Sequence, residues 1–129
     1  MRYLLDTHAL LWALTDPASL GDAAARVIRD ADASLVVSAA SAWEIATKQR
    51  HGRLPQADAI VATYARHLQR LRAEPLPITD DHALLAGRLE WDHRDPFDRM
   101  LAAQAIIESM TLVTRDVAFA GLRGIRTLW

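Results

Sequence analysis

The sequence predicts an α/β fold of three layers, with helices on both faces of a mainly parallel sheet of four to five strands. Short apolar runs alternate with helical segments along the whole chain, which is typical of a parallel sheet. Runs such as Leu35–Val37 are apolar at every position, as expected for strands buried on both faces. The length of 129 residues fits one domain, spanning 1–129.

The first half of the chain is expected to contain two strands and four helices. After the first apolar run, Leu10, Leu11 and Leu14 lie on one helical face, and Asp16-Pro17 ends that pattern. In order, we expect a strand over Arg2–Leu5, a helix over Thr7–Leu14, a helix that begins at Ser19 or Asp22 and ends near Asp30, a strand over Leu35–Val37, a helix capped by Ser38 or Ser41 that ends at His51-Gly52, and a long helix from about Ala57 to Leu71.

In the second half, proline positions locate the elements. The prolines of Pro75–Ile78 are tolerated in an edge strand, and Asp95-Pro96 is typical of a helix start. In order, we expect an edge strand over Pro75–Ile78, a helix over His82–Leu89 capped by Asp80 or Asp81, a helix from Asp95-Pro96 to Ser109, a strand over Thr111–Thr114, a turn or short helix over Val117–Leu122, and a last strand over Ile125–Leu128.

The composition excludes several classes of protein. The net charge is −1, from 15 basic and 16 acidic residues, which argues against binding nucleic acid through a broadly basic surface. Cysteine is absent, which excludes disulfides, zinc–thiolate sites and a cysteine nucleophile. No apolar run approaches the roughly 20 residues of a membrane span, and no signal-type segment opens the chain. We therefore expect a cytoplasmic protein without a membrane partner.

Four acidic residues follow strands or open helices. Asp6 comes directly after the first strand, and Asp116 lies two residues past Thr114. Glu44 lies one turn into the segment after the second strand, and Asp98 lies in the first turn of the "DPFDR" helix. Since ligands of parallel sheets bind beyond the carboxyl ends of the strands, we expect the carboxylates of at least three of these residues to meet at one edge.

Each acid also has a purely structural interpretation. Asp6 fits a helix N-cap, Ser41 and Glu44 have the spacing of a capping box, and Asp95 fits an N-cap with Asp98 in the first helical turn. The remaining acid can simply start a turn after its strand. Taken singly, Glu44 and Asp98 fit these structural roles better than a ligand role, whereas their joint placement favours a site.

A cluster of carboxylates favours a hard divalent cation. Two such charges 5 Å apart repel by roughly 3 kcal/mol at an effective dielectric constant of about 20, and magnesium, which prefers oxygen ligands, removes that repulsion. The sequence contains no phosphate-binding GxxxxGK[ST] or GxGxxG motif, no GxSxG and no HExxH. Its five histidines are scattered, and His93, beside "RDPFD", is the one that we single out for a site role.

The motifs together resemble a known family. The segments "YLLDTHALLWAL", "VSAASAWEIATKQRHGRL", "HRDPFDRMLAAQAIIESMTLVTRD" and "GIRTLW" are similar, in the same order, to those of PIN-domain proteins of the VapC toxin type. The resemblance covers nearly the whole chain. It implies a single PIN domain with an α/β/α architecture and a magnesium- or manganese-dependent endoribonuclease that hydrolyses RNA. It also implies an inhibitory partner antitoxin and a homodimer.

The resemblance also implies the site residues. Asp6, Glu44, Asp98 and Asp116 match the four acidic positions of the family, with Asp6 and Asp98 as the surest metal ligands. Glu44 and Asp116 would complete the acidic pocket by binding the metal, directly or through water, or by orienting the attacking water. Asp95 matches the helix cap better than the quartet.

Several residues around the quartet have open interpretations. Thr7 and Thr114 are candidates for hydrogen-bond support of the acids. Arg99 and Arg115, each next to an acid in sequence, fit either substrate-phosphate contacts or charge-balancing salt bridges. Trp43 fits packing better than base stacking.

Two further classes of function stay open. One is a non-catalytic PIN-fold binding module, which the loss of a site acid would favour. The other is a metal-dependent nuclease for a different nucleic acid, such as DNA. Since all four acids are present and the chain has no basic arm, we expect the RNA-cleaving toxin. The helices over Ala57–Leu71 and His82–Leu89 are the candidates for the dimer surface.

Overall fold

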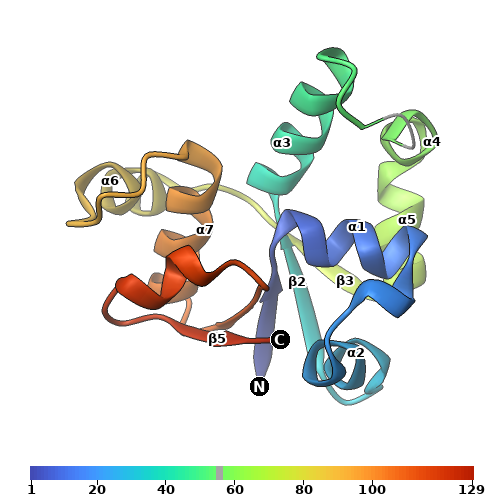
Figure 1. Ribbon diagram of the computed structural model, residues 1–129, viewed down its shortest axis with the longest axis horizontal. Coiled ribbons are helices and arrows are strands. Elements are labelled where there is room, and N and C mark those ends of the chain that lie inside the picture. Colours follow the sequence, from blue (N-terminus) through green and yellow to red (C-terminus); the bar gives the residue numbers. More distant parts are fainter. Residues whose placement is uncertain (55–56) are drawn as a thin grey trace.

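A parallel sheet forms the centre of the structure, a computed structural model that describes residues 1–54 and 57–129 (Figure 1). Five strands lie in the order β3-β2-β1-β4-β5, and each of the four pairings is parallel. The strands are β1 (Arg2–Leu5), β2 (Ser34–Ser38), β3 (Ala73–Leu76), β4 (Thr111–Val113) and β5 (Arg126–Leu128).

Helices cover both faces of this sheet, and the three-layer prediction is confirmed. The α-helices are α1 (Thr7–Thr15), α2 (Asp22–Arg29), α3 (Ala39–Arg50), α4 (Ala57–Ala62), α5 (Tyr64–Leu71), α6 (Asp80–Arg88) and α7 (Pro96–Ile107). Two short 3-10 segments, η1 (Pro17–Ser19) and η2 (Val117–Gly121), complete the described elements. Among the described residues, no helix combines the length and apolarity that crossing a bilayer requires.

The fully apolar strands explain the two cores. Successive side chains of a strand point to opposite faces, so Leu5 and Val37 pack with α1 to α5 whereas Leu4 and Val36 pack with α7 and η2. All four side chains are at most 1% exposed. Because both faces of β1 and β2 are covered, only their ends are accessible, and the carboxyl ends carry the connections to α1 and α3.

Two expectations about helices are wrong. The long helix over Ala57–Leu71 is divided at Thr63, whose backbone leaves helical geometry (φ −130°, ψ 39°) while its hydroxyl donates to the Ala59 carbonyl at 2.9 Å. Such a local hydrogen bond competes with the helical ladder. Helix α6 is capped by Thr79, which accepts from the His82 amide, rather than by an aspartate of the following turn.

Smaller shifts concern element ends. The edge strand β3 begins at Ala73 and ends at Leu76, earlier than expected. Helix α7 ends at Ile107, and Ser109 beyond it has a positive φ of 54°, so the helix cannot continue through it. The 3-10 segment η1 was not expected, although the Asp16-Pro17 break that precedes it was.

Arg99 holds the loop between α6 and α7. Its guanidinium donates to the carbonyls of Ala86 (2.9 Å), Leu89 (2.8 Å), Trp91 (2.9 Å) and His93 (3.0 Å). The guanidinium has five N–H donors, and four are used, one by Ala86 in the last turn of α6 and three by the residues that follow this helix. Neither a substrate-phosphate contact nor a salt bridge therefore describes Arg99, whose role is to fix the backbone that carries His93.

Replacing Arg99 with lysine tests this role. A lysine ammonium is a compact group that cannot span four carbonyls, so Arg99→Lys should lower the free energy of unfolding by about 2–4 kcal/mol. The exposed neighbour Arg94 provides the matched control, since Arg94→Lys should change stability by less than about 0.5 kcal/mol. Urea unfolding measures both, and equal effects of the two substitutions would contradict the assignment.

Candidate active site

Asp6 lies at the junction of β1 and α1, where it is both buried and helix-capping. Its Oδ1 accepts from the Ala9 amide at 2.7 Å, and the residue is only 6% exposed. Burial raises the pKa of Asp6, a hydrogen bond from Thr114 and the Ala9 amide lower it, and the negative charge of Glu44 raises it. The expected N-cap is therefore present, but the carboxylate lies where an ionised group is disfavoured.

The two carboxylate oxygens of Glu44 are bound by side chains from two helices, Thr7 of α1 and Lys48 of α3. The Thr7 hydroxyl donates to Oε1 at 2.6 Å, and the Lys48 ammonium, one turn further along α3, contacts Oε2 at 2.6 Å. The capping-box interpretation of Ser41 and Glu44 is wrong, because α3 begins earlier and is capped by Ser38. The Glu44 carboxylate therefore takes no part in capping α3 and instead accepts from Thr7.

Asp98 does not cap its helix either. Asp95 does so, accepting from the amides of Phe97 (2.9 Å) and Asp98 (3.1 Å), which leaves the Asp98 side chain free for other contacts. Its Oδ2 lies 2.7 Å from Nε2 of His93. Burial raises the pKa of Asp98 to about 6, the His93 contacts lower it, and the nearby charges of Asp95 and Glu44 raise it.

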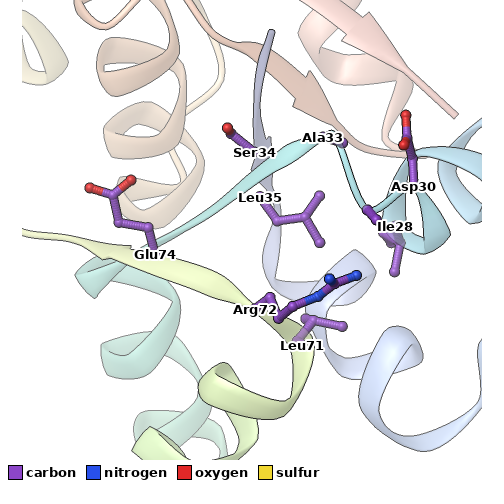
Figure 2. Close-up of a pocket in the computed structure, with 9 residues that line it drawn as sticks. Ile28, Asp30, Ala33, Ser34, Leu35, Leu71, Arg72 and Glu74 are labelled. Carbon is purple, nitrogen blue, oxygen red and sulfur yellow. The ribbon is translucent and has the colours of Figure 1, made fainter.

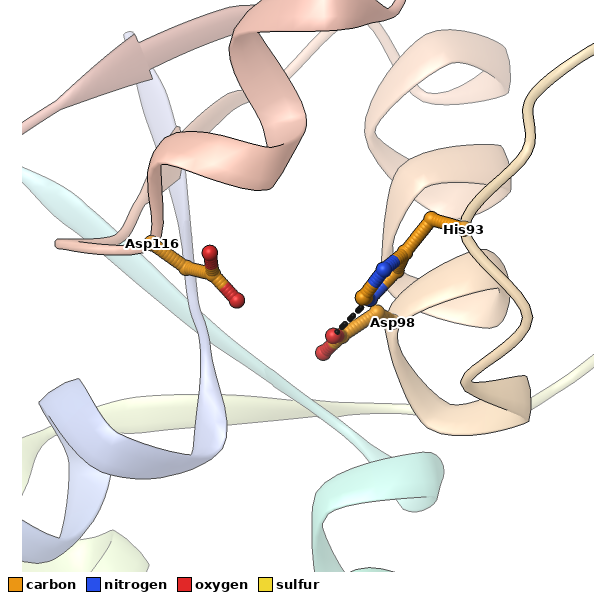
Figure 3. Close-up of side chains that lie close together, drawn as sticks. All are labelled: His93, Asp98 and Asp116. Atoms are coloured by element: carbon orange, nitrogen blue, oxygen red, sulfur yellow. Dashed lines mark hydrogen bonds and ion pairs between the residues drawn. The ribbon is translucent and has the colours of Figure 1, made fainter.

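Asp116 faces Asp98 from the other side of the site. It follows β4, its amide donates to the Thr114 hydroxyl at 3.0 Å, and its Oδ1 accepts from the Ala118 amide at 2.9 Å. Figure 3 shows its carboxylate pointing across a gap towards His93 and Asp98, which are joined by their contact. One potential ligand atom from each of these three side chains lies within 4.8 Å of the others.

The four predicted acids lie at the carboxyl edge of the sheet, and two of them, Asp98 and Asp116, form a close group of ligand atoms with His93, which includes neither Asp6 nor Glu44. Asp6 and Asp116 line one cavity of about 460 Å³. Asp116 is also grouped with Asp98, and the charge of Glu44 raises the pKa of both Asp6 and Asp98. The amino end of α7 therefore brings Asp98 to the edge of the sheet that the other three acids reach from the strands. The sequence spacing alone left this placement open.

A lysine and a histidine that contact the acids complete the site. Lys48 was not anticipated, although the four-residue separation from Glu44 on one helix is a recognisable ion-pair spacing. His93 had been singled out by its neighbouring motif, but its contact with Asp98 depends on the path of the loop that Arg99 fixes. Arg115 forms no ion pair within the described part of the chain and lies over the ring of Trp12, 5.9 Å from its centroid.

A second cavity lies at the opposite end of the sheet. It has a volume of about 210 Å³ and is lined where β2 and β3 begin, by Ser34, Leu35 and Arg72 among others. In Figure 2, its two acids, Asp30 and Glu74, lie on opposite sides of the cavity. It therefore lacks the convergence of carboxylates that distinguishes the carboxyl edge.

Comparisons with known proteins agree with this geometry. The model of the PIN domain family matches residues 3–125. The chain is 32% identical to Ribonuclease VapC22 of Mycobacterium tuberculosis over 129 residues, which is 98% of this chain and 97% of the relative. A second relative, Ribonuclease VapC16 of the same organism, is 37% identical over 62 residues, which is 48% of this chain and 43% of that protein.

Solved structures share the fold at low sequence identity. The VapBC2 structure from Rickettsia felis, bound to a DNA fragment from its promoter, matches with a TM-score of 0.67 at 15% identity, over 99% of this chain and 98% of the other. VapBC-1 from nontypeable Haemophilus influenzae matches with a TM-score of 0.66 at 19% identity, over 99% and 97%. With the family match and the full-length relative, these findings place the chain in the PIN-domain family, among the proteins of the VapC type.

Proposed function

We propose that this protein is a divalent-metal-dependent endoribonuclease that acts as the toxin of a toxin–antitoxin pair. The observation that carries the proposal is the convergence of Asp6, Glu44, Asp98 and Asp116, in which burial raises the pKa of Asp6 and Asp98. Groups with strongly perturbed pKa values in a cavity mark functional sites. The resemblance to a relative named as a ribonuclease supports RNA as the substrate.

The donor set fits magnesium or manganese. Carboxylate oxygens dominate it, and these suit hard divalent cations. His93 contacts Oδ2 of Asp98 through Nε2, which fits a residue that orients a ligand rather than a ligand itself. When bound, such an ion lowers the pKa of a water molecule and stabilises the charge that develops at phosphorus.

The burial and hydrogen bonds of each acid indicate its role in the proposed site. Asp6 and Asp98 would hold the metal, because their buried carboxylates have the greatest need of a neutralising cation. Asp116, more exposed, would hold it through water. Glu44, whose oxygens are bound by Thr7 and Lys48, would orient the attacking water rather than take a direct metal bond.

The remaining polar groups would support the acids and the substrate. Thr7 fixes Glu44, and Thr114 connects two strand ends through its contacts with Asp6 and Asp116. Arg115 is exposed at the same cavity and would contact the substrate phosphate.

We also propose an antitoxin partner and a homodimer. A negatively charged pocket favours an inserted arginine, and the antitoxin would present one in a C-terminal segment. For the homodimer, Leu84 on α6 is 59% exposed and Ile107 at the end of α7 is 41% exposed. These side chains favour the surface of α6 and α7 over that of α4 and α5 as the contact between copies.

Cleavage of RNA by the purified protein tests the function. We expect cleavage of a cellular RNA pool with magnesium or manganese and none in excess EDTA, since the carboxylates alone cannot supply the metal's chemistry. Asp6→Asn and Asp98→Asn should each reduce the rate by about 100-fold or more. Loss of a group that only orients a metal ligand already costs about 10- to 100-fold, and loss of a ligand should cost more.

The exposed Asp32, at the turn before β2, provides the matched control for these substitutions. Asp32→Asn makes the same change of charge at the opposite end of the sheet and should leave the rate unchanged. Undiminished cleavage in EDTA would reject the metal mechanism. Failure to cleave any RNA would favour the binding module, and cleavage of DNA alone would favour the other nuclease class.

The pH dependence of stability tests the site without a substrate. The pKa of Asp98 is raised to about 6 in the folded state, so between about pH 4 and pH 6 the folded protein holds a proton that the unfolded chain has lost. The free energy of unfolding of the metal-free protein should therefore fall as pH rises through this window, by about 1–3 kcal/mol from this group.

Asp98→Asn removes this effect while keeping an oxygen that can accept from His93. The variant should be more stable than the wild type at pH 7.5 in EDTA, the advantage should vanish near pH 4, and magnesium should stabilise it less than the wild type. Thermal melts at both pH values measure this, with Asp32→Asn as the control. An equal loss of stability at both pH values, with an unchanged magnesium response, would leave Asp98 with a helix-terminus role only.

Light scattering tests the homodimer. A nuclease assay and a structure of the co-expressed complex test the antitoxin. The protein alone should have the mass of a dimer, and Leu84→Glu should convert it to a monomer that keeps its fold. Co-expression with the product of a neighbouring antitoxin gene should give a stable complex without nuclease activity. A monomeric wild type would reject the dimer, and an inhibited complex whose acidic pocket stays open would reject occlusion by an arginine.

A further inference from the structure

The cavity beside the carboxylates has a second, aromatic wall that metal binding does not explain. Its six lining residues are Asp6, His8, Trp12, Arg115, Asp116 and Val117. Asp6 and Asp116 belong to the acidic cluster, whereas the other four side chains offer two rings, a guanidinium and an apolar group. Val117 is 85% exposed, so its apolar surface is available at the mouth of the cavity.

Trp12 is held in place by its neighbours. Its ring lies 5.5 Å from that of His8 and 5.6 Å from that of Trp129, with tilts of 41° and 55° between the ring planes. Trp129 is itself tightly packed, because a Cβ atom at Gly21 would come within 2.6 Å of its ring. The indole of Trp12 is therefore a preorganised wall, which lowers the entropic penalty of binding a flat group.

Arg115 faces this wall and is free to adjust. Its guanidinium carbon lies 5.9 Å from the centre of the Trp12 ring, and the side chain is exposed. A flat group in contact with both needs a separation of about 7 Å, twice the usual contact distance. A movement of the arginine by about 1 Å therefore opens a slot between an indole and a guanidinium.

We propose that Trp12 and Arg115 bind a nucleobase of the RNA strand, in the nucleotide adjacent to the phosphate that is cleaved. Aromatic rings and arginine planes are the groups on which proteins stack unpaired bases. His8 and Val117 line the same cavity, where the ring nitrogens of His8 would meet polar groups of the base and Val117 would offer apolar contact. Because the same cavity contains Asp6 and Asp116, one nucleotide reaches both the base site and the acids.

This site deepens the proposed function and rests on it for the identity of the strand. It requires a base that is not already stacked in a duplex, so the substrate would be a single-stranded or looped segment. The rival platform is Trp43, which is 55% exposed but packs edge-on against Phe97 with ring centres 4.6 Å apart. Trp43 is not among the residues that line the cavity of Asp6 and Asp116.

Nuclear magnetic resonance of the metal-free protein in EDTA tests the site independently of cleavage. The four indole N–H signals are followed during titration with adenosine and with uridine, and ribose serves as the control for sugar binding. The Trp12 signal, identified by its absence from Trp12→Phe, should shift saturably with either nucleoside and not with ribose. Equal shifts with ribose, or a shift of the Trp43 signal in place of Trp12, would overturn the proposal.

A pair of substitutions separates stacking from packing. Trp12→Phe keeps a π face, whereas Trp12→Leu keeps apolar volume without one. In cleavage of a short unstructured RNA, Trp12→Leu should raise KM by about 5- to 150-fold, the loss expected for one stacked base, with a smaller change for Trp12→Phe. Trp43→Leu should leave KM unchanged. Equal KM changes in the two Trp12 variants, with equal melting temperatures, would indicate packing alone.

The two proposals fail in different ways. If the protein cleaves no RNA yet adenosine shifts the Trp12 signal, the base site stands and the nuclease is rejected. If cleavage depends on metal and on Asp98 but no nucleoside shifts the Trp12 signal, the nuclease stands and the base site is rejected.

Discussion

The burial of several carboxylates close to one another is the constraint on which the rest of the site depends. Asp6 and Asp98 lie where burial disfavours their charged forms, and Glu44 adds a like charge to both. The chain offsets part of this repulsion with its own groups: Lys48 on Glu44, His93 on Asp98 and the Ala9 amide on Asp6. Such partial compensation keeps the acids close and leaves their carboxylates available to the divalent cation that we propose.

The fold determines which acids meet. In a parallel sheet whose faces are both covered, the carboxyl edge is the accessible end of β1, β2 and β4, so residues just beyond these strands share one place. Asp6, Glu44 and Asp116 reach it in this way. Asp98 reaches it from α7, and its contact with His93 depends on the α6–α7 loop, where Arg99 donates to the carbonyls of Leu89, Trp91 and His93.

The sequence predicts those features that follow from local pattern. The strands and the N-caps of Asp6 and Asp95 depend on residues close to one another in sequence, whereas the shared place of the acidic quartet follows from the order of strands and helices. The partners of the acids depend on contacts that no local pattern encodes. Thr7 reaches Glu44 across 37 residues. Arg99 was expected either at a phosphate or in a salt bridge, because only its neighbour Asp98 was visible in the sequence. Similarly, the break at Thr63 depends on a hydrogen bond that competes with a regular helix.

Capping and metal binding are not exclusive roles for an acid, and the proposed site would divide them in two ways. At α7 the roles belong to separate residues: Asp95 satisfies the first amides, so the Asp98 carboxylate is available to His93 and to a cation. At α1 one residue would serve both in the proposed site, because Oδ1 of Asp6 accepts from Ala9 while the carboxylate also lines the cavity. Replacing Asp98 therefore removes charge without uncapping a helix. Replacing Asp6 removes charge while its amide variant still offers an oxygen to Ala9, so asparagine, rather than alanine, isolates the electrostatic role at both positions.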